Sequence, residues 1–143
     1  MTLALHEAES ALAHGDIPIG ALVIDADGVV IARAHNQREL GQDPTAHAEM
    51  LALRAAAKER GTWRLDGCTV VVTMEPCPMC AGAIGQARVD VVVFGAWNEE
   101  YGAAGSHWDL LRDRRLAHRP EVVGGVLANE CGTLVRAFLS AMR

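Results

Sequence analysis

Residues 68–87, CTVVVTMEPCPMCAGAIGQA, constrain the fold more than any other stretch of the chain. The β-branched run CTVVVTM predicts a buried strand. Pro76 and Pro78 follow it directly, and proline is typical of the first turn of a helix because it fixes φ and lacks a backbone N–H. We therefore expect a strand that runs straight into a helix, with Cys77 and Cys80 at the junction.

The rest of the chain also alternates strand-like and helix-like segments. Residues 18–34 predict two strands around DADG, an Asp-Gly hairpin signal. Apolar spacing and turn residues predict helices over 2–14, about 46–60 and 128–142, strands over 89–95 and in EVVGGV, and polar loops over 36–44 and 96–106. Ser106, with Asp109 three residues later, predicts a helix N-cap. The alternation predicts one domain, residues 1–143, of the α/β class, with a mixed sheet and helices on both faces.

The composition argues against several classes of protein. Half of the residues are hydrophobic and 22% are charged, and no apolar run approaches the roughly 18 residues of a membrane span. The segment MTLALHEAES lacks a basic leader and resembles an amphipathic helix, so we expect a cytoplasmic protein that does not enter the membrane. The formal net charge of −5 argues against broad, non-specific nucleic-acid binding.

One basic run contrasts with this negative charge. Residues 112–119, RDRRLAHR, are named the arginine segment here, and they hold four arginines: Arg112, Arg114, Arg115 and Arg119. These side chains are candidate RNA contacts. The alternative is an ordinary solvated surface with an aspartate inside it, and both interpretations stay open on the sequence.

Candidate metal ligands occur at two loop-to-helix junctions, PTAHAE and EPCPMC. Cys77 and Cys80 are three residues apart and share one face of a first helical turn, so both sulfurs can reach one ion. Together with His47 they give one imidazole and two thiolates, a donor set that fits zinc and leaves a fourth position for water. Zinc lowers the pKa of such a water to about 7, and Glu49 is placed to take its proton and pass it to a substrate.

These residues together predict a zinc-dependent hydrolase, and two other interpretations stay open. A lone CxxC pair can be redox-active, and a zinc-stabilised binding module is the non-enzymatic alternative. Glu49 argues against the module, because a structural zinc normally has four protein ligands and no use for a neighbouring carboxylate. The other two cysteines, Cys68 and Cys131, lie in apolar surroundings, and we expect them to be small buried hydrophobic residues.

HxE followed by PCxxC resembles the signature of the zinc-dependent cytidine and nucleobase deaminases. DPTAHAEM with ALR, TVVVTMEPCPMCAGAI, VVFGA, GAAGS and GVLANEC also resemble segments of the bacterial tRNA-specific adenosine deaminases, in the same order, from about Ile17 to Leu139. GAAGS beyond FGA points to this tRNA-editing branch rather than to guanine or cytosine deaminases. The resemblance implies a cytidine deaminase-like three-layer α/β/α sandwich with about five strands, a homodimer, and one zinc ion with a bound water per subunit.

The resemblance also implies an activity, the hydrolytic deamination of adenosine to inosine at the wobble position of a tRNA anticodon stem-loop. Zinc-bound hydroxide would attack C6 while Glu49, as proton shuttle, protonates N1 and then the departing amine. His47, Cys77 and Cys80 match the zinc ligands of the family. Asn36 in AHNQ matches an asparagine that hydrogen-bonds the purine, although an asparagine after a strand is also a common turn residue.

Further substrate contacts are expected around this site. Asn98 stands where bacterial relatives commonly have an aspartate, and the lost negative charge reduces repulsion of a nucleic-acid backbone. Trp97 and Tyr101 are candidates to stack on flanking bases, with packing against the loop or a partner subunit as the alternative. The backbone N–H of Ala48 is the last candidate contact. The net negative charge and the few basic residues in AFLSAMR keep a second substrate class open, free nucleobases or nucleosides (guanine, cytosine or adenosine).

Overall fold

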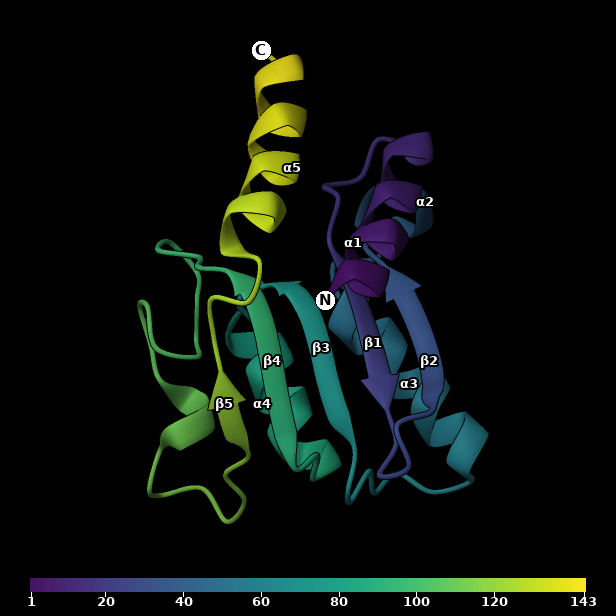
Figure 1. The fold of residues 1–143 in the computed structure, drawn as a ribbon, viewed down its shortest axis with the longest axis vertical. Coiled ribbons are helices and arrows are strands. Elements are labelled where there is room, and N and C mark those ends of the chain that lie inside the picture. Colours follow the sequence, from purple (N-terminus) through teal and green to yellow (C-terminus); the bar gives the residue numbers. More distant parts are fainter.

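The computed structural model describes residues 1–143 and places one five-stranded sheet between two layers of helices (Figure 1). The strands are β1 (Gly20–Ile24), β2 (Val30–His35), β3 (Thr69–Met74), β4 (Val91–Ala96) and β5 (Glu121–Val123). The helices are α1 (Thr2–Glu9), α2 (Arg38–Gly41), α3 (Ala48–Arg60), α4 (Pro78–Ala87) and α5 (Ala128–Ala141), with the 3₁₀ turns η1 (Ser10–His14) and η2 (Leu110–Arg112). The predicted α/β sandwich is confirmed.

The sheet is mixed, with the strand order β2-β1-β3-β4-β5. β1 pairs antiparallel with β2 and with β3, whereas β3, β4 and β5 run parallel to one another. The predicted hairpin turn follows β1, where the Asp25 carboxylate accepts the N–H groups of Asp27 and Val29. Because Met74 pairs with Ala96, β3 and β4 end at the same edge of the sheet. β2 also ends there, and we name it the carboxyl edge.

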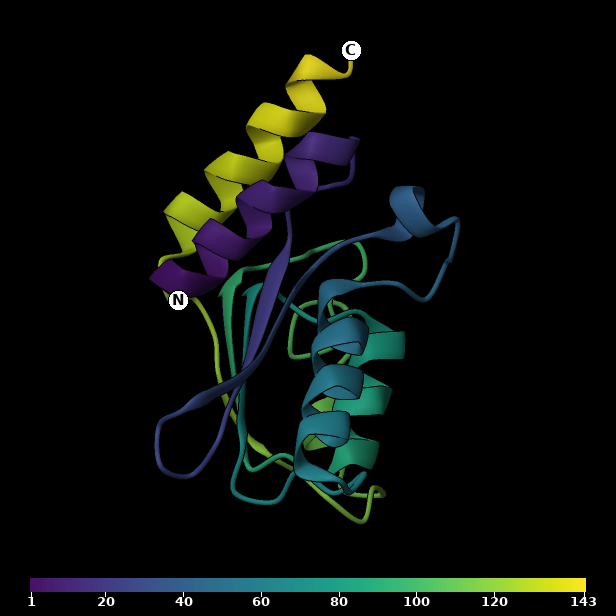
Figure 2. The same cartoon turned by 90° about the vertical axis from the view of Figure 1, so that its right-hand side faces the viewer.

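Helices cover both faces of the sheet, as the alternation of elements predicts. α1 and α5 lie side by side on one face, and α3 and α4 cover the other (Figure 2). Small residues of α3, Ala52 and Ala56, are buried in the main core with Ile84 of α4 and with Val72 and Phe94 of the sheet. Alanines at the contact let α3 approach the sheet closely. The start of this helix lies near the carboxyl edge because the Gln37 N–H, two residues after β2, donates to the Ala46 carbonyl. No helix is long and apolar enough to cross a membrane.

The predicted polar loop over residues 36–44 is wrong in one respect, because it contains the short helix α2. The buried Asp16 carboxylate accepts the N–H groups of Glu39 and Leu40 at 2.7 and 3.0 Å. Burial would raise the pKa of Asp16, but these bonds and the one with His14 lower it below its ordinary value. The helix is thus stabilised by an acceptor 23 residues away, which the local sequence pattern does not reveal.

The predicted helix cap at Ser106 is also wrong. The helical turn that follows is η2, three residues long, and its N-cap is Asp109. The Ser106 N–H and hydroxyl instead donate to the Glu75 carboxylate, so a long-range acceptor outcompetes the local capping pattern.

Candidate active site

His47 and Glu49 occupy different kinds of position at the start of α3. The preceding turn is fixed by Asp43, whose carboxylate accepts the Thr45 N–H and hydroxyl, each at 2.8 Å. His47 is the N-cap of α3 with an extended backbone (φ −70°, ψ 153°), and Glu49 is the second helical residue. The wide angular separation of residues two apart in a helix therefore does not apply, and both side chains can serve the same helix end.

The two cysteines occupy the corresponding place on α4. Cys77 is the N-cap with an extended backbone (φ −74°, ψ 171°), Pro78 is the first helical residue, and Cys80 is buried in the first turn. This confirms the strand-to-helix junction that the prolines predict. α3 and α4 thus direct two helix N-termini, with their free N–H groups and partial positive charge, toward one place.

The structure brings the three predicted metal ligands together. His47 Nδ1 lies 3.7 Å from Cys77 Sγ and 3.5 Å from Cys80 Sγ, and the three ligand atoms lie within 4.8 Å of one another. In a tetrahedral zinc site, bonds of about 2.1 Å to nitrogen and about 2.3 Å to sulfur give a nitrogen–sulfur separation of about 3.6 Å. The observed separations match this value, so His47, Cys77 and Cys80 fit a zinc ion with three protein ligands.

Interactions within the cluster favour a thiolate at Cys77 and a protonated thiol at Cys80. The hydrogen bond with Cys80 lowers the pKa of Cys77 to about 4, and the bond with His47 adds to this effect. The bond between the two sulfurs, together with burial, raises the pKa of Cys80, and the bond with Cys77 raises the pKa of His47. The protein itself therefore favours a thiolate at Cys77, and a metal ion that binds must displace the proton held by Cys80.

Glu49 is buried directly beside this cluster. It is 5% exposed and lies two residues after the candidate ligand His47, in the first turn of α3. Burial raises the pKa of Glu49 to about 7. A carboxyl group that titrates near neutrality can accept and release a proton within one reaction cycle, so position and pKa both suit the predicted shuttle.

Asn36 and Ala48 lie near the same helix end. Asn36 is 5% exposed, its Nδ2 donates to the Ile17 carbonyl at 3.3 Å, and its Oδ1 accepts a backbone N–H of α2 at the same distance. Both bonds are long, and the next residue, Gln37, donates its N–H to the Ala46 carbonyl. Asn36 is therefore a turn residue that holds its amide close to the residues preceding His47. Ala48 is the first residue of α3, so its N–H has no acceptor within the helix.

The segment 97–106, named the substrate loop here, follows β4 at the carboxyl edge. Within it, the Asn98 Oδ1 accepts the Tyr101 N–H at 3.1 Å and caps a turn. Trp97 packs edge-to-face on Phe94 with 4.8 Å between the ring centroids, yet half of it stays exposed. Tyr101 is also exposed. Trp97 thus packs in part on β4, both rings keep free surface, and their role in stacking stays a prediction.

The arginine segment lies largely away from the cluster. It leads into β5, which is parallel to β4 and begins opposite Val91, at the sheet edge remote from the metal ligands. Arg112 is the member that contacts the substrate loop, through a bond to the Ala104 carbonyl at 3.2 Å. Its other partners are local: Arg112 pairs with Asp109, Arg115 pairs with Asp113, and Arg119 donates to the Arg114 carbonyl. The structure therefore does not bring these four side chains together with the metal ligands.

Glu75 is a site residue to which the sequence patterns assign no role. It lies between β3 and Cys77, is 2% exposed, and accepts hydrogen bonds from three residues of the substrate loop. A signal was present in the sequence, since a glutamate between a buried strand and a proline must find several donors. The small residues of GAAGS offer backbone N–H groups of that kind.

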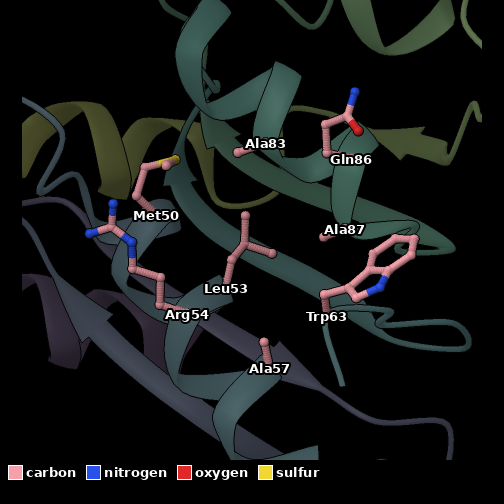
Figure 3. Close-up of a pocket in the computed structure, with 8 residues that line it drawn as sticks. All are labelled: Met50, Leu53, Arg54, Ala57, Trp63, Ala83, Gln86 and Ala87. Carbon is pink, nitrogen blue, oxygen red and sulfur yellow. The ribbon is translucent and has the colours of Figure 1, made fainter. Parts of the chain in front are cut away.

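An apolar groove of about 470 Å³ lies on the outer surface between α3 and α4 (Figure 3). Its lining residues are Met50, Leu53, Arg54 and Ala57 from α3, Ala83, Gln86 and Ala87 from α4, and Trp63 from the connection after α3. None of the candidate site residues lines it. The groove is therefore separate from the cluster of His47, Cys77 and Cys80.

Comparison with known proteins identifies the class that this fold and site define. The family model of the cytidine and deoxycytidylate deaminase zinc-binding region matches residues 1–96, which include all three candidate ligands and Glu49. Within this class, the chain is 50% identical, over its full length and 88% of the relative, to the tRNA-specific adenosine deaminase of Bacillus subtilis (strain 168). It belongs to the tRNA-specific adenosine deaminase family.

Solved structures of related enzymes have the same fold. A structure from a study of A-to-I editing by tRNA:A34 deaminases at the wobble position matches with a TM-score of 0.89 and 40% identity, over 94% of this chain and 96% of that one. The guanine deaminase of Nitrosomonas europaea matches with a TM-score of 0.83 and 26% identity, over 97% and 82%. The predicted cytidine deaminase-like fold is confirmed, and the higher identity lies on the tRNA-editing side.

Proposed function

We propose that this protein is a tRNA adenosine deaminase that converts adenosine to inosine at the wobble position of an anticodon. It would use one zinc ion per subunit, with a bound water. The observation that carries the proposal is the burial of Glu49 against His47, Cys77 and Cys80, which places a proton carrier beside a zinc-type donor set. The full-length likeness to tRNA-specific adenosine deaminases supports the substrate class.

The chain's own residues account for the proton movements of the reaction. His47, Cys77 and Cys80 would hold the zinc ion, which would act as a Lewis acid and lower the pKa of water toward neutrality. Glu49 accepts the proton of that water and donates it to N1 of the purine. As the water oxygen bonds to C6, the same carboxylate would take the remaining proton of that oxygen and carry it to the amine, so that the C6–N bond breaks, ammonia departs and a carbonyl remains. Burial of Glu49 shields these transfers from bulk water.

Asn36, Ala48 and Asn98 are proposed to orient the target base and its backbone. Asn36 carries both a donor and an acceptor, which suits a purine edge, and its two internal bonds are long enough to be exchanged for contacts with the base. The N–H of Ala48 would donate to the same nucleotide. Asn98 places a neutral side chain in the substrate loop, where a phosphate can approach. An anticodon loop also presents an unpaired base at less cost than a duplex does.

Trp97→Ala and Tyr101→Ala are each expected to weaken binding of an anticodon stem-loop by about 5- to 150-fold, which corresponds to about 1–3 kcal/mol per stacked base. The reason is that both rings expose surface on the substrate loop. Fluorescence anisotropy of a labelled stem-loop measures the effect. Val29→Ala, an exposed apolar residue beside the β1–β2 turn, is the control. Unchanged binding in both aromatic variants would mean that the rings pack against protein instead.

Salt dependence tests the arginine segment. Each phosphate contact contributes a slope of about −0.7 to −0.9 to the logarithm of affinity against the logarithm of salt concentration. Arg114 and Arg119 have no carboxylate partner, so changing both to glutamine is expected to make the slope less steep by about 1–2. An unchanged slope would assign the arginine segment to ordinary solvated surface. A flat dependence of the native protein would count against any RNA substrate.

We also propose a cytoplasmic homodimer whose interface includes the groove between α3 and α4. An apolar groove beside an exposed tryptophan, Trp63, is typical of a protein interface. Light scattering should then give twice the 15.3 kDa mass of one chain, and Trp63→Asp should shift the protein toward the monomer. A native protein that stays monomeric at all concentrations tested would exclude this assembly.

A deaminase of free nucleobases or nucleosides is the second candidate, favoured by the shared fold of the guanine deaminase from Nitrosomonas europaea. The deciding experiment measures inosine formation in anticodon stem-loops beside ammonia release from free adenosine, guanine and cytosine. We expect turnover of a stem-loop with adenosine at the wobble position. Turnover restricted to the free compounds would replace the proposed function with the second one.

A further inference from the structure

The Glu75 carboxylate accepts four hydrogen bonds from the substrate loop. Its Oε1 accepts the N–H groups of Ala104 at 3.0 Å and Ser106 at 2.9 Å. Its Oε2 accepts the Asn98 N–H at 3.0 Å and the Ser106 hydroxyl. These donors lie 23 to 31 residues further along the chain, so the bonds attach a distant segment to the residue two places before Cys77.

Backbone hydrogen bonds also join the residues before Cys77 to β4 and to the substrate loop. The Glu75 N–H donates to the Ala96 carbonyl at 2.8 Å, and the Ala103 N–H donates to the Pro76 carbonyl at 2.7 Å. Gly102 lies so close that a Cβ atom there would be 2.3 Å from the Glu75 Oε2. No larger residue fits between the carboxylate and the loop, which gives a physical reason for the glycine that begins GAAGS.

The paired carboxylate selects one conformation of the substrate loop. An ionised carboxylate has about four acceptor sites and no donor, and four donors occupy those of Glu75. Burial of a charged group is costly unless it is paired, so any loop conformation that withdraws these donors leaves Glu75 unsatisfied. The loop is thereby held in place although much of its own surface, including Trp97 and Tyr101, is exposed.

We propose that Glu75 is a positioning residue that holds the substrate loop against the Cys77 junction, so that Trp97 and Tyr101 face the nucleotides flanking the target base. Glu75 acts through Asn98, Ala104 and Ser106 and does not itself touch the substrate. The choice of substrate rests on the proposed function, whereas the attachment of the loop does not.

Glu75→Gln tests the role of the four-acceptor carboxylate at constant side-chain shape. The amide NH₂ group, placed at Oε1, would face two backbone N–H groups, from Ala104 and Ser106. Placed at Oε2, it faces one N–H group, from Asn98, because the Ser106 hydroxyl can rotate and accept. We expect the second orientation, in which Asn98 loses its acceptor while Ala104 keeps its bond.

Amide hydrogen exchange of the zinc-loaded protein is the direct test. In Glu75→Gln, exchange at Asn98 and its loop neighbours is expected to accelerate by about tenfold or more, with no change at core amides such as Val72. Glu100→Gln makes the same change on an exposed side chain of the same loop and should leave exchange unaltered. Ser106→Ala removes one donor and should give a smaller acceleration, which keeps the test decisive if the glutamine variant folds poorly. Unchanged exchange across residues 97–106 in both variants overturns the proposal.

Kinetics separate positioning from a merely structural role. With an anticodon stem-loop, Glu75→Gln is expected to raise KM by about tenfold, the lower part of the range for one lost stacking contact, with a smaller change in kcat and unchanged zinc content. A fall in kcat at constant KM would contradict a role in substrate positioning. If the native protein proves inactive on stem-loops, the proposed function fails, while the exchange experiment still decides whether Glu75 holds the loop.

Discussion

Glu49→Gln is expected to lower kcat by about 10²- to 10⁴-fold while zinc stays bound, since this is the usual contribution of general acid–base catalysis. Glutamine has nearly the same volume, so the buried position beside Cys80 stays filled. Its amide cannot accept a proton from water and return it to the purine. Inosine formation at saturating stem-loop, measured beside the zinc content of the same sample, checks both parts of the prediction.

The matched control is Glu59→Gln, an exposed glutamate at the far end of α3. We expect it to retain the native rate, because it makes the same chemical change far from the cluster. A Glu49→Gln protein that deaminates at the native rate would refute the shuttle. Loss of zinc from the same variant would instead show that Glu49 supports the ligands.

The sequence was sufficient to predict the layers of the fold and the grouping of His47, Cys77 and Cys80 in one place. Proline on both sides of Cys77 placed that residue at a helix start, and the structure makes it the N-cap of α4. His47 is the N-cap of α3, which explains how two residues only two positions apart, His47 and Glu49, serve one site. These features are local, because a helix start, its cap and its first turn lie within a few residues of sequence.

What the sequence did not reveal depends on partners distant along the chain. α2 is stabilised by Asp16, and Ser106 bonds to Glu75 rather than capping a helix. In both cases a buried carboxylate accepts backbone N–H groups more than 20 residues away. The spacing of residues along the sequence does not predict such a pairing. The same limit applies to the arginine segment, whose composition indicates charge but whose position depends on the parallel pairing of β5 with β4.

Cys80→Ser is expected to abolish zinc binding at stoichiometric metal and to remove activity. Both His47 Nδ1–sulfur separations fit a zinc ion, so we expect each sulfur to be a ligand. The hydroxyl of Cys80→Ser would be a far weaker zinc ligand than the thiolate. A ligand present at about 1,000 times its Kd stabilises the native state by about 4 kcal/mol, so the loss of zinc should lower Tm by roughly 10–20 °C. Zinc content and a thermal melt measure the two effects, and a chelator should lower the Tm of the native protein by a similar amount.

Cys68→Ser is the matched control for that variant, because it changes another fully buried thiol to a hydroxyl outside the cluster. It should keep one zinc per chain and full activity, even where the buried hydroxyl costs some stability. If Cys80→Ser retained zinc and the native Tm while Cys68→Ser lost them, the ligand assignment would be wrong. The comparison thus separates metal ligation from core packing, since both sulfurs are buried and the candidate donor set includes just one of them.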